Sequence, residues 1–190
     1  MSRDIMNKNR TSDEADFGTV GALVTAVEKI AGIYHVTEIT IPSQVIITTS
    51  GGENLAAGLE LYTLPDGAVN IIGSAMHVFL TGTTAHEDDT PEVGLGTTIG
   101  SGANATLGAV GAGAENVFGP HVVAGIEDDG TEGALNLSGG SSTTANKSSG
   151  LFLADGDASR TIYLNIADGW AATAGTVTAE GKVYLTWQAF

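Results

Sequence analysis

Cysteine is absent from this 190-residue chain. Its absence excludes a disulfide framework and any metal site built on thiolate ligands, and it leaves the cellular compartment undetermined. Long apolar runs are missing too, so we expect no transmembrane helix and no membrane partner. Residues 1–10 are polar and lack the apolar core of a signal peptide.

Lysine and arginine are scarce, and residues 30–146 contain neither, although thirteen acidic residues lie there. The whole chain has 7 cationic and 22 acidic residues, and its formal net charge is −15. A surface of this sign repels phosphate backbones, so we expect no nucleic-acid partner. Three cations, Arg3, Lys8 and Arg10, fall in the first ten positions. The acidity therefore indicates either plain solubility or an acidic body whose basic tail docks on an acidic partner.

Catalytic motifs are lacking as well. The four histidines, His35, His77, His86 and His121, have no partner at the i, i+4 spacing of a helical zinc site. No segment satisfies the dinucleotide-binding, Walker A or nucleophile-elbow pattern. We therefore predict that the chain is not an enzyme and needs no cofactor. Each histidine is interpreted as an ordinary structural or surface residue, although folding could still join distant ligands into a metal site.

Acidic clusters are the feature that could bind a metal, and the metal would be calcium, which takes roughly six to eight hard oxygen ligands. The clusters are Glu87, Asp88 and Asp89 with Glu92; Glu127, Asp128 and Asp129; and Asp155 with Asp157. The last pair has the best spacing, because both carboxylates would point to one side of an extended segment. None of the clusters matches an EF-hand loop, and we interpret them as solvated acidic turns.

Alternating strand patterns dominate the rest of the chain. Residues 161–166 place Ile162, Leu164 and Ile166 on one face of a strand, and residues 168–169 supply an Asp-Gly turn. Residues 183–190 form a second such strand, and residues 69–81 a third, in which Met76, Val78 and Leu80 share a face. We count about eight to ten short strands bounded by turn signals and no strand–helix alternation. This pattern predicts an all-β fold, an antiparallel β-sandwich or jelly roll.

The predicted organisation is a flexible N-terminal arm, residues 1–16, followed by a single β-sandwich domain, residues 17–190. The arm is either simply disordered or orders on a neighbouring subunit. Residues 17–31 fit a helical stripe, but their glycines and valines argue against a helix interior. Pro42 is expected to interrupt a strand that begins at Tyr34 and to let it resume at Val45. Residues 93–113 are expected to be either a strand and loops in extended conformation or the packed inside of a narrow sandwich. Residues 138–150 are expected to form a surface loop.

Aromatic residues near the C-terminus allow two interpretations. Tyr163, Trp170, Tyr184 and Trp187 could form a platform that stacks on sugars. At strand spacing, however, such residues are more often core residues and cross-strand pairs.

Three segments resemble signatures of small virion proteins from tailed phages, especially marine ones. They are residues 89–102 (DTPEVGLGTTIGSG), residues 163–171 (YLNIADGWA) and residues 61–68 (LYTLPDGA). Their order and spacing agree with that family, and so does the closing strand, residues 181–187. Residues 26–28 and 35–41 resemble the start of the pattern, which favours strand–turn–strand over helix for residues 20–41. Residues 115–147 depart most from it.

This resemblance implies a β-sandwich on the capsid surface of a virion, most simply a decoration or cement protein. Such a protein would bind the major capsid protein and clamp neighbouring coat subunits, commonly as a homotrimer at local threefold positions. The alternatives are another virion component, either a coat subunit or a tail or fibre protein, and a carbohydrate-binding adhesin module.

Overall fold

The computed structural model describes residues 18–31, 33–50, 52–83, 86, 89–123, 126, 133–138, 151–170 and 174–190, with residues 31 and 133–138 described as backbone only. The predicted arm, residues 1–16, lies outside the described residues. So do the predicted surface loop beyond Ser138 and the acidic run at residues 127–129. The division into an arm and a single domain therefore stays a prediction.

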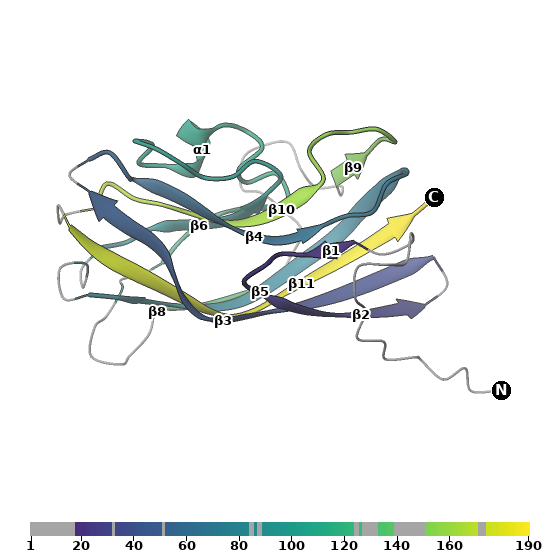
Figure 1. The fold of residues 1–190 in the computed structure, drawn as a ribbon, viewed down its shortest axis with the longest axis horizontal. Helices are drawn as coiled ribbons and strands as arrows, with labels where there is room; N and C mark the ends of the chain where they lie inside the picture. The colour runs from purple at the N-terminus through teal and green to yellow at the C-terminus, as the bar shows by residue number, and fades with distance from the viewer. Residues whose placement is uncertain are drawn as a thin grey trace.

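Strands make up two sheets that lie one above the other (Figure 1). The smaller sheet consists of β1 (Thr19–Val20), β4 (Ala56–Thr63), β6 (Glu92–Gly96), β7 (Phe118–Val122) and β10 (Thr161–Ala167), in the order β1-β4-β10-β6-β7. The larger sheet consists of β2 (Thr25–Ala31), β3 (Tyr34–Ser50), β5 (Val69–Gly82), β8 (Gly133–Ser138) and β11 (Ala174–Ala189), in the order β2-β3-β11-β5-β8, with β9 (Leu151–Leu153) beside β5.

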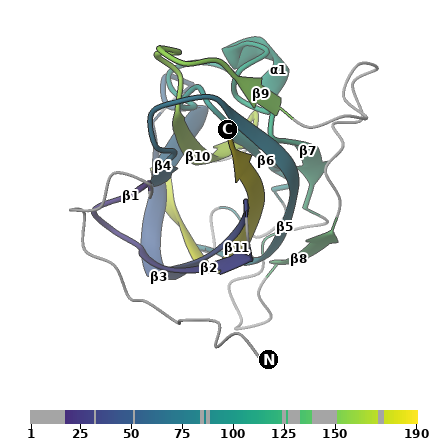
Figure 2. The same ribbon diagram turned by 90° about the vertical axis from the view of Figure 1, so that its right-hand side faces the viewer.

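Every strand pairing is antiparallel, and one hydrophobic cluster draws its residues from both sheets. Figure 2 shows the ribbon of the two sheets turned by 90° from the view of Figure 1. The predicted all-β antiparallel sandwich is thus confirmed. The finer jelly-roll topology stays a prediction.

The core follows the predicted alternation. Met76, Val78 and Leu80 of β5 are buried, whereas His77 between them is exposed. In β10, Ile162, Leu164 and Ile166 are fully buried, as predicted. On the opposite face of β10, Asn165 is also fully buried, although strands with this alternation typically have one open face. The reason is that the segment after β6 folds back over this face of the sheet.

The strands are longer than expected, which corrects the prediction of short strands alone. β3 has 17 residues and β11 has 16, and they pair with each other along almost their whole length. The sequence placed this closing strand at residues 183–190, which covers only the second half of β11. Gly181 has a φ of 138°, a backbone conformation that favours glycine. A Cβ at this position would lie 2.1 Å from the His77 carbonyl oxygen, so the strand needs a residue without a side chain here.

The expected interruption of β3 at Pro42 is wrong. The strand runs through Pro42, and β11 shifts its register opposite this position, between Ala179 and Gly181. β2 pairs with β3 only as far as Thr40, so neither neighbour needs a hydrogen bond from the Pro42 nitrogen. Pro42 lies on an open edge on the β2 side of the strand and opposite a β-bulge on the β11 side, so a continuous strand can contain it.

The helical alternative for residues 17–31 is wrong over the described part of that segment. It forms β1, a turn and β2, and β3 follows after a second turn. The one helix in the described part of the chain is α1 (Leu107–Val110), in a region predicted to be extended. Thr106 caps it by accepting a hydrogen bond from the Ala109 amide at 3.2 Å. No helix within the described residues is long and apolar enough to cross a membrane.

Candidate interaction surface

One side of the sandwich has strand edges that are only half covered. β2 pairs with β3 from Tyr34 to Thr40, and beyond Thr40 the described residues provide β11 as the only strand partner of β3. On the other sheet, β1 pairs with β4 at Tyr62 and Thr63, and the Gly21 amide that follows β1 donates to the Leu61 carbonyl at 2.9 Å. The N-terminal segment thus closes one half of this side and leaves the other half open.

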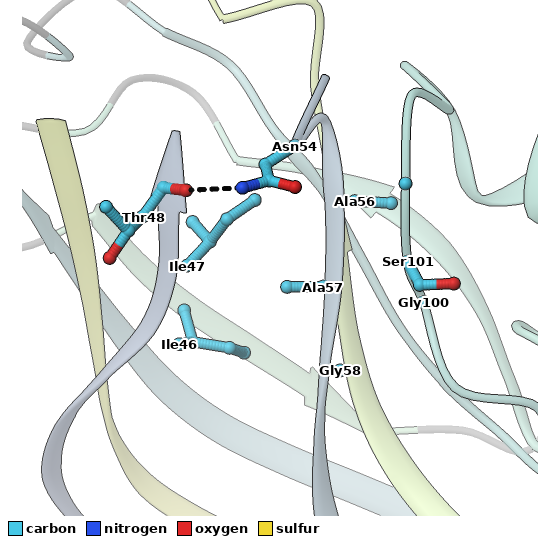
Figure 3. Close-up of a pocket in the computed structure, with 10 residues that line it drawn as sticks. Ile46, Ile47, Thr48, Asn54, Ala56, Ala57, Gly58, Gly100 and Ser101 are labelled. Atoms are coloured by element: carbon cyan, nitrogen blue, oxygen red, sulfur yellow. Dashed lines mark hydrogen bonds between the residues drawn. The ribbon is translucent and has the colours of Figure 1, made fainter. Parts of the chain in front are cut away.

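A groove lies in the open half, between β3, β4 and the loop after β6 (Figure 3). Its volume is about 360 Å³. We call it the β3–β4 groove and define it by its lining residues, Ile46, Ile47, Thr48, Asn54, Ala56, Ala57, Gly58, Gly100, Ser101 and Gly102. The lining is apolar and small in its middle, and Asn54 spans one end by donating a hydrogen bond to the Thr48 carbonyl at 3.4 Å.

The groove is suited to an extended peptide. An unpaired strand edge offers main-chain donors and acceptors, and alternate side chains of an added strand can enter the space between the sheets. Val45, on the same edge, has 53% of its surface exposed. The groove was not predicted from the sequence, because its walls come from two strands and a loop whose adjacency depends on sheet order.

The surface around the groove is acidic. Glu53 and Glu60, on the hairpin and strand beside it, are both exposed. Among the described residues the exposed cations are Lys29 and Lys182, and both face Glu38: Lys182 Nζ contacts one carboxylate oxygen, and Lys29 Nζ lies 4.0 Å from the other. Neither cation offsets the charge near the groove, because Glu38 already engages both.

Arg160, the third cation of the described part, is buried and holds loops together. Its guanidinium donates to the carbonyls of Pro65 at 2.6 Å and Ala154 at 2.8 Å, and also to that of Gly67. These contacts fasten the turn before β5 to the turn after β9. Arg160 is therefore structural and contributes little positive potential at the surface.

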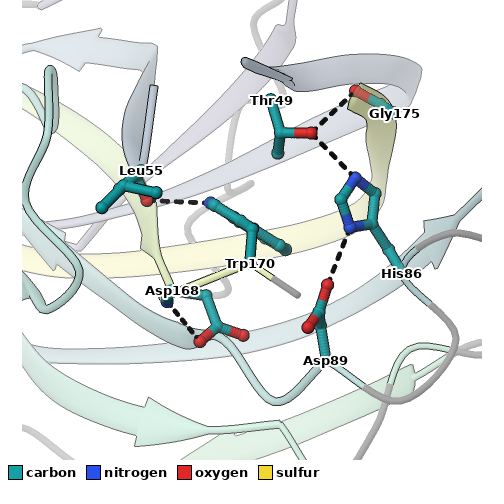
Figure 4. A network of polar contacts seen from close by, with 8 residues as sticks. Thr49, Leu55, His86, Asp89, Asp168, Trp170 and Gly175 are labelled. Carbon is teal, nitrogen blue, oxygen red and sulfur yellow. Dashed lines mark hydrogen bonds and ion pairs between the residues drawn. The ribbon is translucent and has the colours of Figure 1, made fainter. Parts of the chain in front are cut away.

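His86 is fully buried at the centre of a polar chain (Figure 4). Its Nδ1 lies 2.7 Å from Asp89 Oδ2, and its Nε2 lies 3.0 Å from the Thr49 hydroxyl. With Nδ1 protonated toward the carboxylate, Nε2 accepts from Thr49, whose oxygen also lies 3.4 Å from the Gly175 carbonyl. The chain joins β3, β11 and the loop after β5.

This hydroxyl–imidazole–carboxylate order is that of a nucleophile and its base. Thr49 is nevertheless only 3% exposed, and a Cβ on Gly175 would lie 2.4 Å from the His86 ring nitrogen. Thr49 is buried and Gly175 packs against the His86 ring, so a substrate has no access to the Thr49 hydroxyl. The arrangement therefore fastens three segments of the fold and is consistent with the prediction that His86 is structural.

A second buried network surrounds Glu28. Its carboxylate lies 2.6 Å from His35 Nδ1 and accepts a hydrogen bond from the Tyr62 hydroxyl at 2.5 Å. The Gly18 amide donates to the same hydroxyl at 2.8 Å, and the His35 ring stacks on Trp187 with ring centroids 3.9 Å apart. Burial, reinforced by the negative charge of Glu28, raises the pKa of Tyr62 above its ordinary value. The network anchors the chain where it enters the sandwich.

The remaining histidines are not brought together. His77 is exposed on β5 and His121 half-buried on β7, each beside a phenylalanine ring. No group of three or more histidine or carboxylate side chains within the described residues is arranged to hold a metal ion.

The acidic clusters are dispersed as far as they are described. Asp155 and Asp157 are exposed, but they flank Gly156 in a turn (φ 77°) instead of lying along an extended segment, so the expected alignment is wrong. Asp89 binds His86, and Glu92 accepts from the Leu107 amide at 2.8 Å. Glu87, Asp88 and residues 127–129 lie outside the described residues, so calcium binding there stays untested.

Asp168 is a half-buried carboxylate beside this region. Its Oδ1 accepts from the Gly169 amide at 2.6 Å (Figure 4). Burial raises the pKa of Asp168 above its ordinary value, and the nearby charges of Asp89 and Glu92 act in the same direction.

The tryptophans belong to the core, so the sugar-platform interpretation is wrong for both. Trp187 is fully buried and Trp170 is 6% exposed. The Trp170 indole donates to the Leu55 carbonyl at 3.0 Å and meets His86 edge-on, with ring centroids 5.2 Å apart. Both indoles pack inside the sandwich and present no flat surface to a ligand.

The three segments that resemble phage virion proteins share one sheet. Residues 61–63 lie in β4, residues 92–96 in β6 and residues 163–167 in β10, and β10 pairs with both of the others. The Asn165 side chain holds the loop of the second segment in place through the Gly100 amide (2.8 Å) and the Thr98 carbonyl (2.9 Å). No protein-family model, curated protein or solved structure matches the chain.

Proposed function

We propose that this chain is a virion structural protein, a decoration or cement protein that binds the outer capsid lattice and stabilises contacts between coat subunits. The observation that carries the proposal is that the three segments resembling virion proteins form adjacent strands of one sheet. The three segments therefore all contribute residues to neighbouring strands of the smaller sheet.

The charge distribution supports an outer position. Of the described cations, Arg160 is buried among carbonyls, and the two lysines share Glu38. A body with this surface gains nothing from DNA packed inside a capsid, because phosphates repel it. On the outer surface the same charge costs nothing and keeps the particle soluble.

The rigidity of the sandwich supports a clamping role. Two buried polar networks, around His86 and Glu28, tie strands of the two sheets to their connecting segments. A coat under internal pressure is strengthened by a partner that keeps its shape across a seam. Assembly as a homotrimer, which we also propose, would multiply such contacts and raise the effective concentration of each at the lattice.

The test is quantitative mass spectrometry of purified particles, reporting copies of this chain relative to the major capsid protein. We expect a ratio within a few-fold of one. A handful of copies per particle would replace the capsid role with a tail or fibre role, and absence from particles would overturn the virion proposal.

A further inference from the structure

We propose that residues 1–16 of one copy add as a β-strand to the open edge of β3 in a second copy and fill its β3–β4 groove. This interaction goes beyond the role on a capsid, since it joins copies of this chain to one another. It requires no coat protein and can be tested on the isolated chain.

The open edge is long and uncharged, and it needs a cover. Val45 is 53% exposed on it, and Ile46 is half-buried beside the groove. Uncovered edges of this kind recruit further strands, and natural proteins protect them with charges, prolines or an added segment. Between Ile41 and Ser50 the edge has one proline and no charged residue.

Pro42 determines where a strand can be added. It has no amide to donate, so pairing is favoured on its C-terminal side, at residues 44–48. This stretch includes Ile46, Ile47 and Thr48, which line the groove. A strand of about five residues would satisfy it, and a 16-residue segment is long enough to provide that strand and a connection to its own domain, since it extends to about 50 Å.

The direction of β1 favours a second copy over the same chain. Thr19 pairs with Thr63 and Val20 with Tyr62, so the chain before Gly18 points past Thr63, away from the groove at Ala56. Gly18 is fixed there, because its amide donates to the Tyr62 hydroxyl and a Cβ would lie 2.1 Å from the Thr63 carbonyl. To reach its own groove the segment would have to reverse and run back along the whole of β4.

The charge and the side chains of residues 1–10 also fit the β3–β4 groove of a second copy. Residues 1–10 have three cations and one acid, a formal +2, whereas the other 180 residues have four cations and 21 acids, a formal −17. Glu53 and Glu60 are exposed beside the groove and are available to the arm cations. Ile5 and Met6 are adjacent, so a strand places one of them toward the groove whichever face it presents.

An arm in a neighbour's groove is a head-to-tail contact. Such contacts close into rings when the rotation between copies allows it. The arrangement therefore predicts a cyclic oligomer in which every groove is filled and every arm is used.

The test uses engineered disulfides, because the chain has no cysteine of its own. One set of full-length proteins has a single cysteine in the arm, at Ile5, Met6 or Asn9, and a second protein has Val45→Cys. Mixed under oxidising conditions, at least one arm variant is expected to cross-link to Val45→Cys, since a disulfide needs Cα atoms within about 7 Å. Mass spectrometry identifies the linked peptides.

The matched control is Ile72→Cys, a position on β5 that is 43% exposed and lies away from the groove. Docking predicts at least about a tenfold lower yield with this control, because only docked thiols meet at high effective concentration. Equal yields at both positions would overturn the proposal. So would predominant Val45–Val45 linkage, which indicates edge-to-edge pairing of two copies.

A chain with both Met6→Cys and Val45→Cys distinguishes docking of an arm from a second copy from docking of the chain's own arm. Linkage between chains supports the second copy, and linkage confined to one chain overturns it. Reversal of the arm charges, with Arg3→Glu, Lys8→Glu and Arg10→Glu together, is expected to lower the cross-linking yield. These residues precede the described fold, so circular dichroism should show an unchanged domain.

Discussion

Trp187 donates its indole N–H to the hydroxyl of Thr37 at 2.9 Å, and both side chains are fully buried. The two residues are 150 positions apart in the sequence and lie on β11 and β3, the central pair of the larger sheet. A threonine on the core face of a strand is unusual, and this contact explains it. Without a partner, the buried indole N–H would lose its hydrogen bond to water and gain nothing in return.

Thr37→Val keeps the shape of the side chain and removes the acceptor. The unpaired indole N–H should lower the free energy of unfolding by about 1–3 kcal/mol. For a domain of this size the loss corresponds to a decrease of about 2–12 °C in Tm. Thermal unfolding followed by tryptophan fluorescence measures it. Thr40→Val, at a half-buried position on the same strand, is the control, and an equal loss in both variants would contradict the role of the hydrogen bond.

Asp168→Asn should stabilise the protein at pH 7. The raised pKa means that the folded state binds the Asp168 proton more tightly than the unfolded state does. The wild-type protein therefore loses stability as the pH rises from the ordinary carboxyl value to the raised one, and the loss persists at higher pH. The amide can still accept from Gly169. Solvent screening keeps the gain below about 1 kcal/mol, or at most about 4 °C in Tm.

The measurement is Tm as a function of pH for both proteins. The difference between them should shrink as the pH falls through the titration of Asp168. Asp155→Asn, in an exposed turn, serves as the control for the loss of one carboxylate charge. A difference that stayed constant down to pH 4 would show that Asp168 is not the titrating group.

Alternation predicted the strands well where a strand has one buried face and one open face. β5 and β10 show this, because their apolar residues fall at every second position. Asn165 lies on the other face of β10, where alternation alone indicates exposure, and yet it is fully buried. Its burial depends on a loop from residues 97–116, and no local pattern in β10 reports what covers a sheet face.

Strand ends and edges could not be predicted, because they depend on the partner strand. Pro42 breaks a strand only where a neighbour requires its amide, and the register shift in β11 removes that requirement. The β3–β4 groove depends on how far β2 and β1 extend over their neighbours. The two histidine networks arise for the same reason: Glu28, Asp89 and their partners meet only when the sheets are assembled.

Asn165→Ala should destabilise the loop over the smaller sheet. The Asn165 side chain accepts from the Gly100 amide and donates to the carbonyls of Thr98 and Ala114, at 2.8, 2.9 and 2.7 Å. Removing it leaves three main-chain groups without this partner, so we expect a loss of at least about 2 kcal/mol. Hydrogen exchange should accelerate at residues 97–116 first.

Asn104→Ala is the matched control for this change. Asn104 lies in the same loop but is only half-buried, and its side chain donates a solvent-exposed hydrogen bond to the Ser101 carbonyl. Its replacement should change stability by less than about 0.5 kcal/mol. Similar effects of the two substitutions would mean that the loop does not depend on the buried amide.

Deletion of residues 1–16 should weaken binding to capsids and leave the domain folded. The described fold begins at Gly18 and β1 at Thr19, so every described contact of the sandwich remains in the shortened chain. Co-sedimentation with particles that lack this chain should show on the order of tenfold weaker binding, because copies no longer joined through their arms lose the multivalent attachment of the oligomer to the lattice. A Gly/Ser segment of the same length is the control for tether length. Unchanged affinity of the shortened chain would remove the arm from the capsid interaction.

Gly96→Ala tests why one of the phage-like segments is so rich in glycine. A Cβ at residue 96 would lie 2.1 Å from the Gly113 carbonyl oxygen, a main-chain atom that cannot move without shifting the loop. We expect a loss of about 2–3 kcal/mol or more in the free energy of unfolding, as for other overpacked sites.

Gly73→Ala, on β5, is the control: a Cβ there meets nothing within 4 Å, and the backbone needs no positive φ. Alanine at 73 should instead stabilise the strand by up to about 1 kcal/mol, because it restricts the unfolded chain. Chemical denaturation of both variants measures the contrast, and equal effects would mean that the segment needs glycine for some reason other than close packing.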